Sequence, residues 1–327
     1  MALEASVRTE RYPLSVPFVI SRGTRTHAEV VVVTLTDGAI IAQGEGVPNA
    51  RYGESVESSS AEIEKILPLL MEGAGRAQIA KRMKHGAARN AVDCALWDLE
   101  AKRAGKTIAQ LAGLPPSKPV TTVYTLSLGT PEFMGEQAAA QAQRPILKLK
   151  LGGAGDVERV RAVRANAPNC VLVADANEAW TPALFAEMIG PIKELGLAML
   201  EQPMPAGKDE DLRTLPRLIP VCADESCHDR GDLKDLVGKY DMINIKLDKT
   251  GGLTEALALA SDARDYGFGL MVGCMVGTSL SMAPTHLIAQ LCKYTDIDAP
   301  LLLAQDRAHG MRYVGSVVEP PVSALWG

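Results

Sequence analysis

The sequence predicts an α/β protein in which a parallel (β/α) barrel of seven or eight units follows a smaller α+β domain. Strand and helix candidates alternate after residue 120, whereas the first 115 residues show two strands followed by two helices. Five of the later strand candidates also end in charged residues at nearly regular spacing. The length of 327 residues, 47% of them hydrophobic and 22% charged, suits a large buried core in about two domains.

Two β-branched runs predict the strands of the leading domain. They are Val16–Ile20 and Val30–Leu35, and the polar segment Ser21–Glu29 between them is expected to be a loop. Thr36-Asp37-Gly38 is a turn signal at the end of the second run. A hairpin-like pair of strands is therefore expected near the amino terminus.

Two helical patterns follow these strands. The first covers about residues 56–71 and the second about 87–103, with Gly105 placed to end the second helix. Proline cannot continue a helix, so Pro115-Pro116-Ser117 marks an expected boundary. We therefore expect a capping domain over residues 1–115.

From residue 120 onward, strand and helix candidates alternate. The strand candidates begin near Val120, Ile146, Val171, Ala198, Val221, Met242, Gly269 and Thr295. Helical patterns between them cover residues 156–166, 182–195, 252–266 and 279–291. This alternation produces parallel strands joined by right-handed crossovers, and so many units in about 180 residues fit a TIM-like barrel better than an open sheet. The barrel is expected over residues 116–302, and residues 303–327 are expected to complete the capping domain.

Composition excludes several classes of protein. The net charge is −5 and no basic cluster is interleaved with aromatic residues, so nucleic acid is not an expected partner. No segment approaches about 18 uninterrupted apolar residues, and the amino terminus lacks the apolar stretch of a signal peptide. The six cysteines show no C-x-x-C spacing. These features predict a cytoplasmic protein with reduced thiols and no membrane partner.

Charged residues end five apolar strand candidates, where a hydrophobic core normally excludes them. These residues are Lys148 and Lys150, then Asp175, Glu201, Asp224 and Lys246. From Lys150 onward the successive steps are 25, 26, 23 and 22 residues, close to the length of one strand-plus-helix unit. Because the carboxyl ends of barrel strands converge at one mouth, we expect three carboxylates between two sets of lysines.

The three acids, Asp175, Glu201 and Asp224, offer hard oxygen ligands on neighbouring strands. Three carboxylates with open coordination positions suit Mg²⁺, which keeps waters or substrate oxygens in its shell. A single acid at a strand end more commonly caps the next helix or lies in solvent. Three acids in register, flanked by lysines, instead indicate a metal site.

The lysines supply candidate bases. Lys148 and Lys150 are two residues apart in a strand, so their side chains share a face about 7 Å apart. Two neighbouring ammonium groups repel each other, which favours loss of a proton from one of them. Lys246 is expected across the same mouth, in too apolar a setting for a surface lysine. A base on each side of a metal-bound carboxylate permits removal of an α-proton from one face and its return to the other.

Five motifs resemble the enolase superfamily, in its muconate-lactonizing subgroup. They are Lys148-Leu149-Lys150, Asp175-Ala176-Asn177, Glu201-Gln202-Pro203, Ala223-Asp224-Glu225-Ser226 and Asn244-Ile245-Lys246-Leu247. The resemblance covers the whole chain and implies that the leading domain caps the barrel mouth. It also implies proton transfer through a Mg²⁺-stabilised enediolate, with Lys150 and Lys246 exchanging roles and Lys148 assisting electrostatically.

Within that subgroup the sequence most resembles the L-Ala-D/L-Glu dipeptide epimerases. The resemblance lies in Asp296-Ile297-Asp298 and in Arg22-Gly23-Thr24-Arg25. In that family the D-x-D pair holds the dipeptide's α-ammonium group, and Arg25, with Arg22 as a close competitor, is assigned to the glutamyl carboxylate. Without the resemblance, these acids are more typical of loops or helix caps, and the arginines of solvated loops.

Two further residues are weaker candidates for substrate contact. Ser279, after the seventh strand candidate, could donate a hydrogen bond to the substrate, with helix N-capping as the alternative. Tyr52 is expected to shape the closed site from the capping domain. The sequence leaves both assignments open.

The sequence thus predicts an isomerase: a Mg²⁺-dependent epimerase of L-Ala-D/L-Glu type dipeptides, with a place in murein peptide recycling implied by the resemblance. A lyase or cycloisomerase of the same subgroup, such as o-succinylbenzoate synthase or muconate cycloisomerase, would use the same metal and lysines. Asp296 and Asp298 argue against it, because those substrates carry no ammonium group. A catalytically inactive barrel that serves only as a binding module is the remote alternative. The lysine acting on each epimer, the strictness for glutamate and the oligomeric state stay open.

Overall fold

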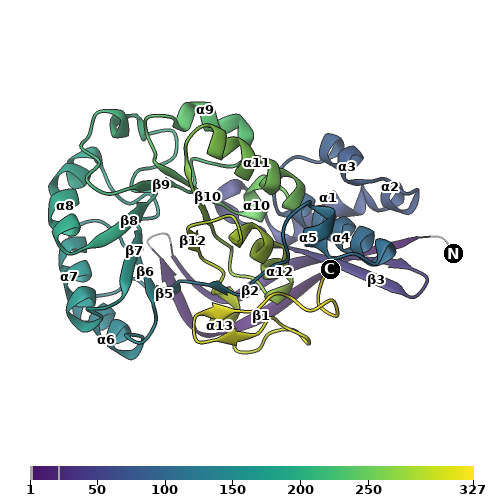
Figure 1. The fold of residues 1–327 in the computed structure, drawn as a ribbon, viewed down its shortest axis with the longest axis horizontal. Helices are drawn as coiled ribbons and strands as arrows, with labels where there is room; N and C mark the ends of the chain where they lie inside the picture. Colours follow the sequence, from purple (N-terminus) through teal and green to yellow (C-terminus); the bar gives the residue numbers. More distant parts are fainter. Residues whose placement is uncertain (1–2, 21–22) are drawn as a thin grey trace.

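The computed structural model describes residues 3–20 and 23–327 (Figure 1). An antiparallel sheet with its helices forms one side of the molecule, and a parallel sheet surrounded by helices forms the other. The predicted combination of a (β/α) barrel and an α+β capping domain is confirmed. Across the described ranges, no helix combines the length and the apolar character needed to cross a bilayer. All six cysteines are free thiols, as predicted.

The capping sheet contains β1 (Glu4–Ile20), β2 (Gly23–Asp37) and β3 (Ile40–Gly46), paired antiparallel in that order. Its strands are longer than predicted, and residues 23–29 of the expected loop belong to β2. The prediction failed because the far part of the ribbon formed by β1 and β2 is largely exposed on both faces, so its polar sequence carries no burial pattern. Residues 21 and 22 lie outside the described ranges.

Helices cover one face of this sheet. They are α1 (Val56–Glu64), α2 (Leu67–Met71), α3 (Arg76–Arg82), α4 (Ala87–Ala104) and α5 (Ile108–Leu111), with a 3-10 turn at Ala50–Tyr52. Gly105, in the left-handed conformation, caps the carboxyl end of α4, as predicted. The single helix predicted over 56–71 is instead two helices, because Pro68 cannot continue α1 and stands in the first turn of α2. Helix α3 was not predicted.

The core of the capping domain depends on a close approach between β3 and α4. Gly44 and Gly46 face the backbone of α4 at Ala91 and Ala87. A Cβ placed on Gly44 would lie 2.1 Å from the carbonyl oxygen of Ala91 and 2.5 Å from the backbone nitrogen of Ala95. Only glycine allows this separation, so these positions set how deeply α4 sits on the sheet.

Gly44→Ala is therefore expected to lower the free energy of unfolding by about 3 kcal/mol, because rigid helix backbone must move to admit the methyl group. Urea unfolding monitored by circular dichroism measures the effect. Gly75→Ala is the matched control, since a Cβ there meets no atom within 4 Å and the residue has an extended backbone. Equal stabilities for the two variants would contradict the packing argument.

The barrel sheet has eight parallel strands in sequential order. They are β5 (Tyr124–Leu126), β6 (Ile146–Lys150), β7 (Val171–Asp175), β8 (Leu197–Glu201), β9 (Val221–Ala223), β10 (Met242–Ile245), β11 (Gly269–Val272) and β12 (Tyr294–Thr295). The backbone nitrogen of Val123 donates to the carbonyl oxygen of Thr295 at 2.8 Å, which links the two edges of the sheet. The strands therefore curl into the predicted barrel.

The strand predicted to begin near Val120 is divided between two sheets. Residues Val120–Thr121 form β4, which pairs with β14 (Val317–Val318) next to β13 (Tyr313–Val314), and the first barrel strand begins only at Tyr124. One continuous run of β-branched and aromatic residues can supply two short strands when the backbone turns between them. Periodicity alone does not show where that turn lies.

Helices surround the barrel sheet. They are α6 (Pro131–Ala140), α7 (Asp156–Asn166), α8 (Pro182–Glu194), α9 (Leu233–Leu236), α10 (Leu247–Thr250), α11 (Leu253–Asp265), α12 (Ser279–Ala289) and α13 (Ala299–Leu302). The four predicted helical segments correspond to α7, α8, α11 and α12. After β8 the chain forms only a 3-10 turn, Glu210–Arg213, so this unit of the barrel is modified.

Strand register brings the charged residues to one level. Lys150 is paired with Asp175, and Asp175 with Glu201, in the parallel ladders of β6, β7 and β8. Below this level the barrel interior is filled by side chains such as Val173, Met199 and Met271. The charged residues therefore lie together at the carboxyl ends of the strands, above a closed apolar core.

The carboxy terminus lies beside α4 (Figure 1). The indole nitrogen of Trp326 donates to the carbonyl oxygen of Cys94 at 3.0 Å, and the backbone nitrogen of Gly327 donates to Asp98 at 2.6 Å. On the opposite side, the carbonyl oxygen of Val19 accepts from the backbone nitrogen of Leu128 at 3.2 Å. The capping sheet thus reaches the barrel mouth, while the end of the chain holds α4 from outside.

His286 on α12 predicts a pH-dependent stability. The side chain is fully buried, and its Nε2 lies 3.3 Å from the carbonyl oxygen of Val318. Burial lowers its pKa from 6.5 to about 4. Between these values the unfolded chain binds more protons than the folded protein, so stability falls as the pH falls.

The free energy of unfolding is expected to drop by about 2 kcal/mol between pH 7.5 and pH 5 because of this one group. Urea unfolding at both pH values tests this. His286→Gln keeps a donor for Val318 but does not titrate, so it should lose less stability over the same interval. An identical pH dependence in the variant would show that His286 is not responsible.

Candidate active site

The three predicted metal ligands meet at the barrel mouth. Asp175 and Glu201 end strands β7 and β8, and Asp224 follows β9. One oxygen from each carboxylate lies within 4.8 Å of the other two, and all three side chains are buried. This spacing is small enough for one cation to contact all three acids.

The backbone after two of these strands is held in an uncommon conformation. Asn177, Glu178 and Gln202 have φ values of 43°, 68° and 33°, in the left-handed region that non-glycine residues rarely adopt. Asn177 donates to both carboxylate oxygens of Asp175, from its backbone nitrogen at 2.8 Å and its side-chain nitrogen at 3.0 Å. These bonds hold the conformation at Asn177, and a left-handed backbone by itself costs about 1–3 kcal/mol per residue.

The lysines flank the acids. The Nζ of Lys150 lies 2.7 Å from Asp175, and the Nζ of Lys246 lies 2.6 Å from Asp224. Lys150 ends β6 and Lys246 follows β10, with the three acid-bearing strands β7, β8 and β9 between them in the sheet. The two amines therefore approach the acid cluster from opposite sides of the mouth.

Lys148 lies deeper and contacts more than one acid. Its Nζ is 2.7 Å from Glu201 and 2.6 Å from Asp296, and the side chain is 1% exposed. Burial opposes the charged form, but Asp296, Glu201 and Asp175 outweigh it and raise the pKa of Lys148 well above its usual value. Carboxylates therefore surround Lys148, and the mutual repulsion of the two lysines beside a bound cation stays a prediction.

The acids respond differently to this environment. Burial and the charge of Asp175 raise the pKa of Glu201 to about 7. Burial also opposes ionisation of Asp224, but Lys246 and Lys249 reverse that effect and hold its pKa well below the usual range. The raised pKa of Glu201 thus reflects burial and crowding of carboxylates that a divalent cation would offset.

Two residues of this cluster were not singled out from the sequence. The side-chain nitrogen of Asn244 donates to Glu201 at 2.7 Å, and the Nζ of Lys249 donates to Asp224 at 2.6 Å. Asn244 lies two residues before Lys246, so the two side chains share a face of an extended chain, which was a usable signal. Lys249 lies in a polar-looking turn, Asp248-Lys249-Thr250, that is buried between the domains. Its role depends on packing that the sequence pattern does not reveal.

A cavity opens above the acids between the two domains. The capping domain contributes Phe18, Arg25, Asn49 and Tyr52, and the barrel contributes Lys150, Asn177, Asp224, Glu225, Lys246, Cys274, Met275 and Val276. The structure thus brings Arg25 and Tyr52 to the same cavity as the flanking lysines. Arg22, the other predicted arginine, lies outside the described residues.

An ion pair anchors the capping loop that carries Tyr52. Arg51 binds Glu178 with two hydrogen bonds, from Nε at 2.9 Å and from Nη2 at 2.8 Å. Glu178 follows β7 directly after Asn177. This bidentate pair fixes the capping loop to the strand end that supplies Asp175.

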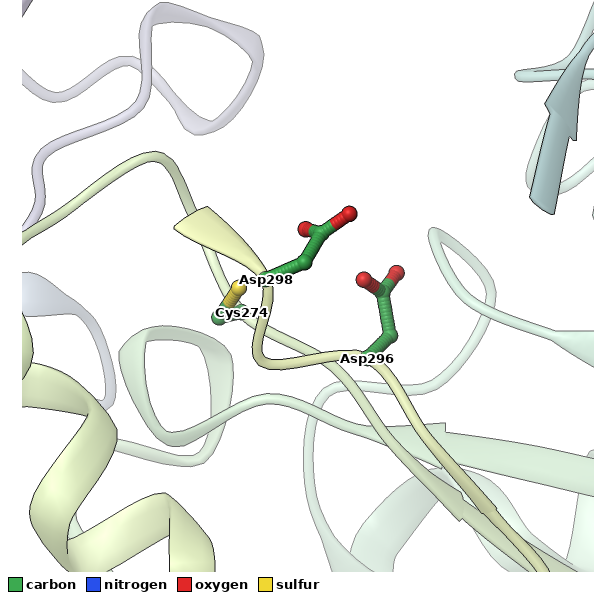
Figure 2. Close-up of side chains that lie close together, drawn as sticks. All are labelled: Cys274, Asp296 and Asp298. Carbon is green, nitrogen blue, oxygen red and sulfur yellow. The ribbon is translucent and has the colours of Figure 1, made fainter. Parts of the chain in front are cut away.

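Asp296 and Asp298 follow β12, and their carboxylates extend to the same side of the chain, with the Cys274 thiol close by (Figure 2). Asp298 accepts a hydrogen bond from the backbone nitrogen of Thr125 at 2.7 Å. Burial and the neighbouring Asp296 raise the pKa of Asp298 to about 7. The pair lies just past the strand rather than on it, yet its two acids still converge.

Ser279 is placed differently from the other candidates. It begins α12, is fully buried and does not line the cavity. Its hydroxyl donates to Asp306 and accepts from the backbone nitrogen of Met311 at 2.8 Å. Thr278, one residue earlier, caps the helix. The structure therefore gives Ser279 a role in holding the segment 306–311 and does not bring it to the other site residues.

Two family models match this chain. Residues 2–113 match the mandelate racemase/muconate lactonizing enzyme N-terminal domain, and residues 134–319 match the enolase C-terminal domain-like model. The chain belongs to the enolase superfamily. This membership confirms the resemblance inferred from the five strand-end motifs, and the two matched segments correspond to the capping sheet with its helices and to most of the barrel.

Individual superfamily members are similar over nearly the whole chain. The L-Ala-D/L-Glu epimerase of Escherichia coli strain K12 is 46% identical over 91% of this chain and 93% of its own length. An N-acetyl-D-glutamate racemase from Pseudoalteromonas is 40% identical over 91% of this chain and 95% of its own.

A solved structure of an enolase family member from Agrobacterium tumefaciens, with homology to dipeptide epimerases and bound to sodium and L-Ala-L-Glu, is 49% identical. It covers 99% of this chain and 100% of its own, with a TM-score of 0.98. A dipeptide epimerase from Cytophaga hutchinsonii, complexed with Mg and D-Ala-L-Val, is 27% identical over 98% and 94% of the two chains, with a TM-score of 0.91.

Proposed function

We propose that this protein is a Mg²⁺-dependent epimerase that inverts the carboxy-terminal residue of L-Ala-D/L-Glu type dipeptides, with murein peptide recycling as its setting. One observation carries the proposal: Lys150 and Lys246 flank the acid cluster at opposite sides of one cavity, which Arg25 also lines. The similarity to dipeptide epimerases and to an L-Ala-L-Glu complex supports the same assignment.

The acid cluster fits Mg²⁺. It consists only of carboxylate oxygens, which are the ligands this ion prefers. Among the described residues, Glu201 Oε2 receives no hydrogen bond, although it is buried and lies 2.7 Å from the Lys148 Nζ. Asp175, Glu201 and Asp224 would therefore hold the ion. When bound, Mg²⁺ supplies positive charge that stabilises negative charge developing on the substrate carboxylate.

The two flanking lysines perform the proton transfer. In one direction Lys150, as a neutral amine, accepts the α-proton of the carboxy-terminal residue, and Lys246, as an ammonium, donates a proton to the opposite face. The reverse reaction exchanges their roles. Because the two amines lie on opposite sides of the mouth, configuration at the α-carbon inverts. Lys148 keeps its positive charge between Glu201 and Asp296 and so offsets negative charge near the reacting carbon.

Charge complementarity selects the substrate. Asp296 and Asp298 present two carboxylates, which suit the free α-ammonium group of a dipeptide. Arg25 lines the cavity from the capping domain and suits the carboxylate of a glutamyl side chain. The paired acids disfavour N-acylated amino acids and the substrates of the lyase and cycloisomerase alternatives, which carry no ammonium group.

Proton NMR in D₂O tests the proposal. The enzyme with Mg²⁺ should place solvent deuterium at the glutamyl α-carbon of L-Ala-L-Glu and produce the L-Ala-D-Glu epimer. N-acetyl-L-glutamate serves as the matched control, because it keeps the glutamate but lacks the ammonium group. Exchange with the control but not with the dipeptide would reject the dipeptide assignment.

Arg25→Ala is expected to lower kcat/KM for L-Ala-L-Glu by about 10²-fold, because a charged hydrogen bond to the side-chain carboxylate contributes about 1.5–3 kcal/mol. L-Ala-L-Gln lacks this carboxylate, so its kcat/KM should change far less. Steady-state kinetics with both dipeptides separates the two effects. An equal loss for both would mean that Arg25 shapes the cavity without recognising glutamate.

A further inference from the structure

Gln202 joins the ends of β8 and β9. It follows Glu201 directly, and its side-chain oxygen accepts hydrogen bonds from the backbone nitrogens of Asp224 at 2.8 Å and Ser226 at 3.1 Å. Its own backbone nitrogen donates to the carbonyl oxygen of Cys222 at 2.9 Å. One fully buried amide thus connects two of the three acids through the backbone that carries them.

Three neighbouring oxygen atoms set the orientation of this amide. The side-chain nitrogen of Gln202 lies 2.9 Å from the hydroxyls of both Tyr240 and Ser226, and 2.8 Å from the carbonyl oxygen of Met204. An amide nitrogen can only donate, and all three neighbouring atoms can accept. The amide therefore cannot turn over without facing donors with its nitrogen and acceptors with its oxygen.

A buried carboxylate organises those hydroxyls. Asp209 accepts from Tyr240 and from Ser226, both at 2.6 Å, and from the Nζ of Lys239 at 2.8 Å. Burial opposes its ionised form, but the bonds from Lys239, Ser226 and Tyr240 lower the pKa of Asp209 below its usual value. Asp209 is 1% exposed and none of these four residues lines the cavity above the acids.

The left-handed backbone at Gln202 shows why such support is needed. Its φ of 33° is unfavourable for a side-chain-bearing residue and persists only where the surroundings over-determine it. Relaxation there would move Glu201 on one side and release the backbone nitrogen of Asp224 on the other. Separation of these two acids is what a small octahedral cation tolerates least.

We infer that Tyr240 and Asp209 are positioning residues that act through Gln202 to hold Glu201 and Asp224 at the separation required by the metal. This inference rests on the proposed function for the identity of the ion. Neither residue touches the substrate cavity, so their effect should appear in metal affinity. Residues that support metal ligands in this way typically change metal affinity when they are replaced.

The experiment measures Mg²⁺ binding to the metal-free protein by isothermal titration calorimetry, without substrate. Tyr240→Phe and Gln202→Met are each expected to raise the Mg²⁺ dissociation constant by about tenfold or more. Saturating Mg²⁺ should restore kcat in Tyr240→Phe, which a general folding defect would not allow. Tyr240→Phe keeps the ring, so it provides the test even where Gln202→Met fails to fold.

Tyr12→Phe is the matched control. It also removes a hydroxyl that donates to a carboxylate, at 2.8 Å to Glu10, but in the capping sheet and away from the acids. Its Mg²⁺ affinity should equal that of the unmodified protein. If Tyr240→Phe also binds Mg²⁺ as tightly as the unmodified protein does, the inference is overturned while the proposed function is unaffected. An unmodified protein that binds no Mg²⁺ would contradict the proposed function, and this inference with it.

Discussion

Lys150→Met and Lys246→Met are each expected to slow epimerisation by about 10³-fold or more, because each variant lacks one of the two groups proposed to exchange the α-proton. Methionine keeps most of the buried stem and removes the amine. Each variant should retain the remaining lysine on one side of the mouth. That lysine can still remove and return a proton on its own face, without inversion.

Deuterium exchange distinguishes this two-sided arrangement from other causes of inactivity. Each variant should exchange the α-proton of one dipeptide epimer with D₂O, and the two variants should act on opposite epimers. Proton NMR of L-Ala-L-Glu and L-Ala-D-Glu measures this directly. Lys234→Met, at an exposed position after the same barrel strand as Asp224, is the control and should leave the rate unchanged. Exchange of the same epimer by both variants would refute opposite placement of the amines.

Removal of Mg²⁺ is expected to have an effect at least as large. Dialysis against a chelator should lower activity by about 10³-fold or more, because the charge stabilisation supplied by the ion contributes several kcal/mol. Added Mg²⁺ should restore the activity of the unmodified protein. Asp224→Asn should not recover, because an amide supplies no charge and would leave Lys246 and Lys249 without their carboxylate partner.

Asp235→Asn is the control for this substitution, since it makes the same chemical change at an exposed site. Its activity should depend on Mg²⁺ in the same way as that of the unmodified protein. Mg²⁺-independent activity after exhaustive chelation would contradict the metal assignment. Retention of full activity by Asp224→Asn would show that this acid is not required to hold the ion.

The strand-end residues were predictable because two regular features coincide. Barrel strands recur at intervals of one strand-plus-helix unit, and the parallel register places their carboxyl ends at one level. Lys150, Asp175 and Glu201 are direct partners in that register. Arg25 and Tyr52 became site candidates only through the resemblance to a family, since nothing in their local sequence pattern points to the barrel mouth.

Other features depended on contacts between distant segments. Lys249 looks like a solvated residue in the sequence, yet it is buried because α10 lies against α4. Ser279 was a weak candidate for substrate contact, with helix N-capping as the alternative, and its hydroxyl is instead engaged by Asp306 and Met311. The network from Asp209 to Gln202 combines residues whose individual patterns are ordinary.

The sequence by itself determined the barrel, the acid cluster and its flanking lysines, because the strand-plus-helix unit repeats along the chain and a barrel brings the strand ends to one mouth. Only the tertiary structure decided which capping residues reach the cavity, how the long ribbon of β1 and β2 extends, and which buried groups support the acids. Those outcomes follow from side-chain packing and hydrogen bonding between segments up to hundreds of residues apart. No local pattern encodes such contacts, because the partners are far apart in the sequence and meet only in the folded structure.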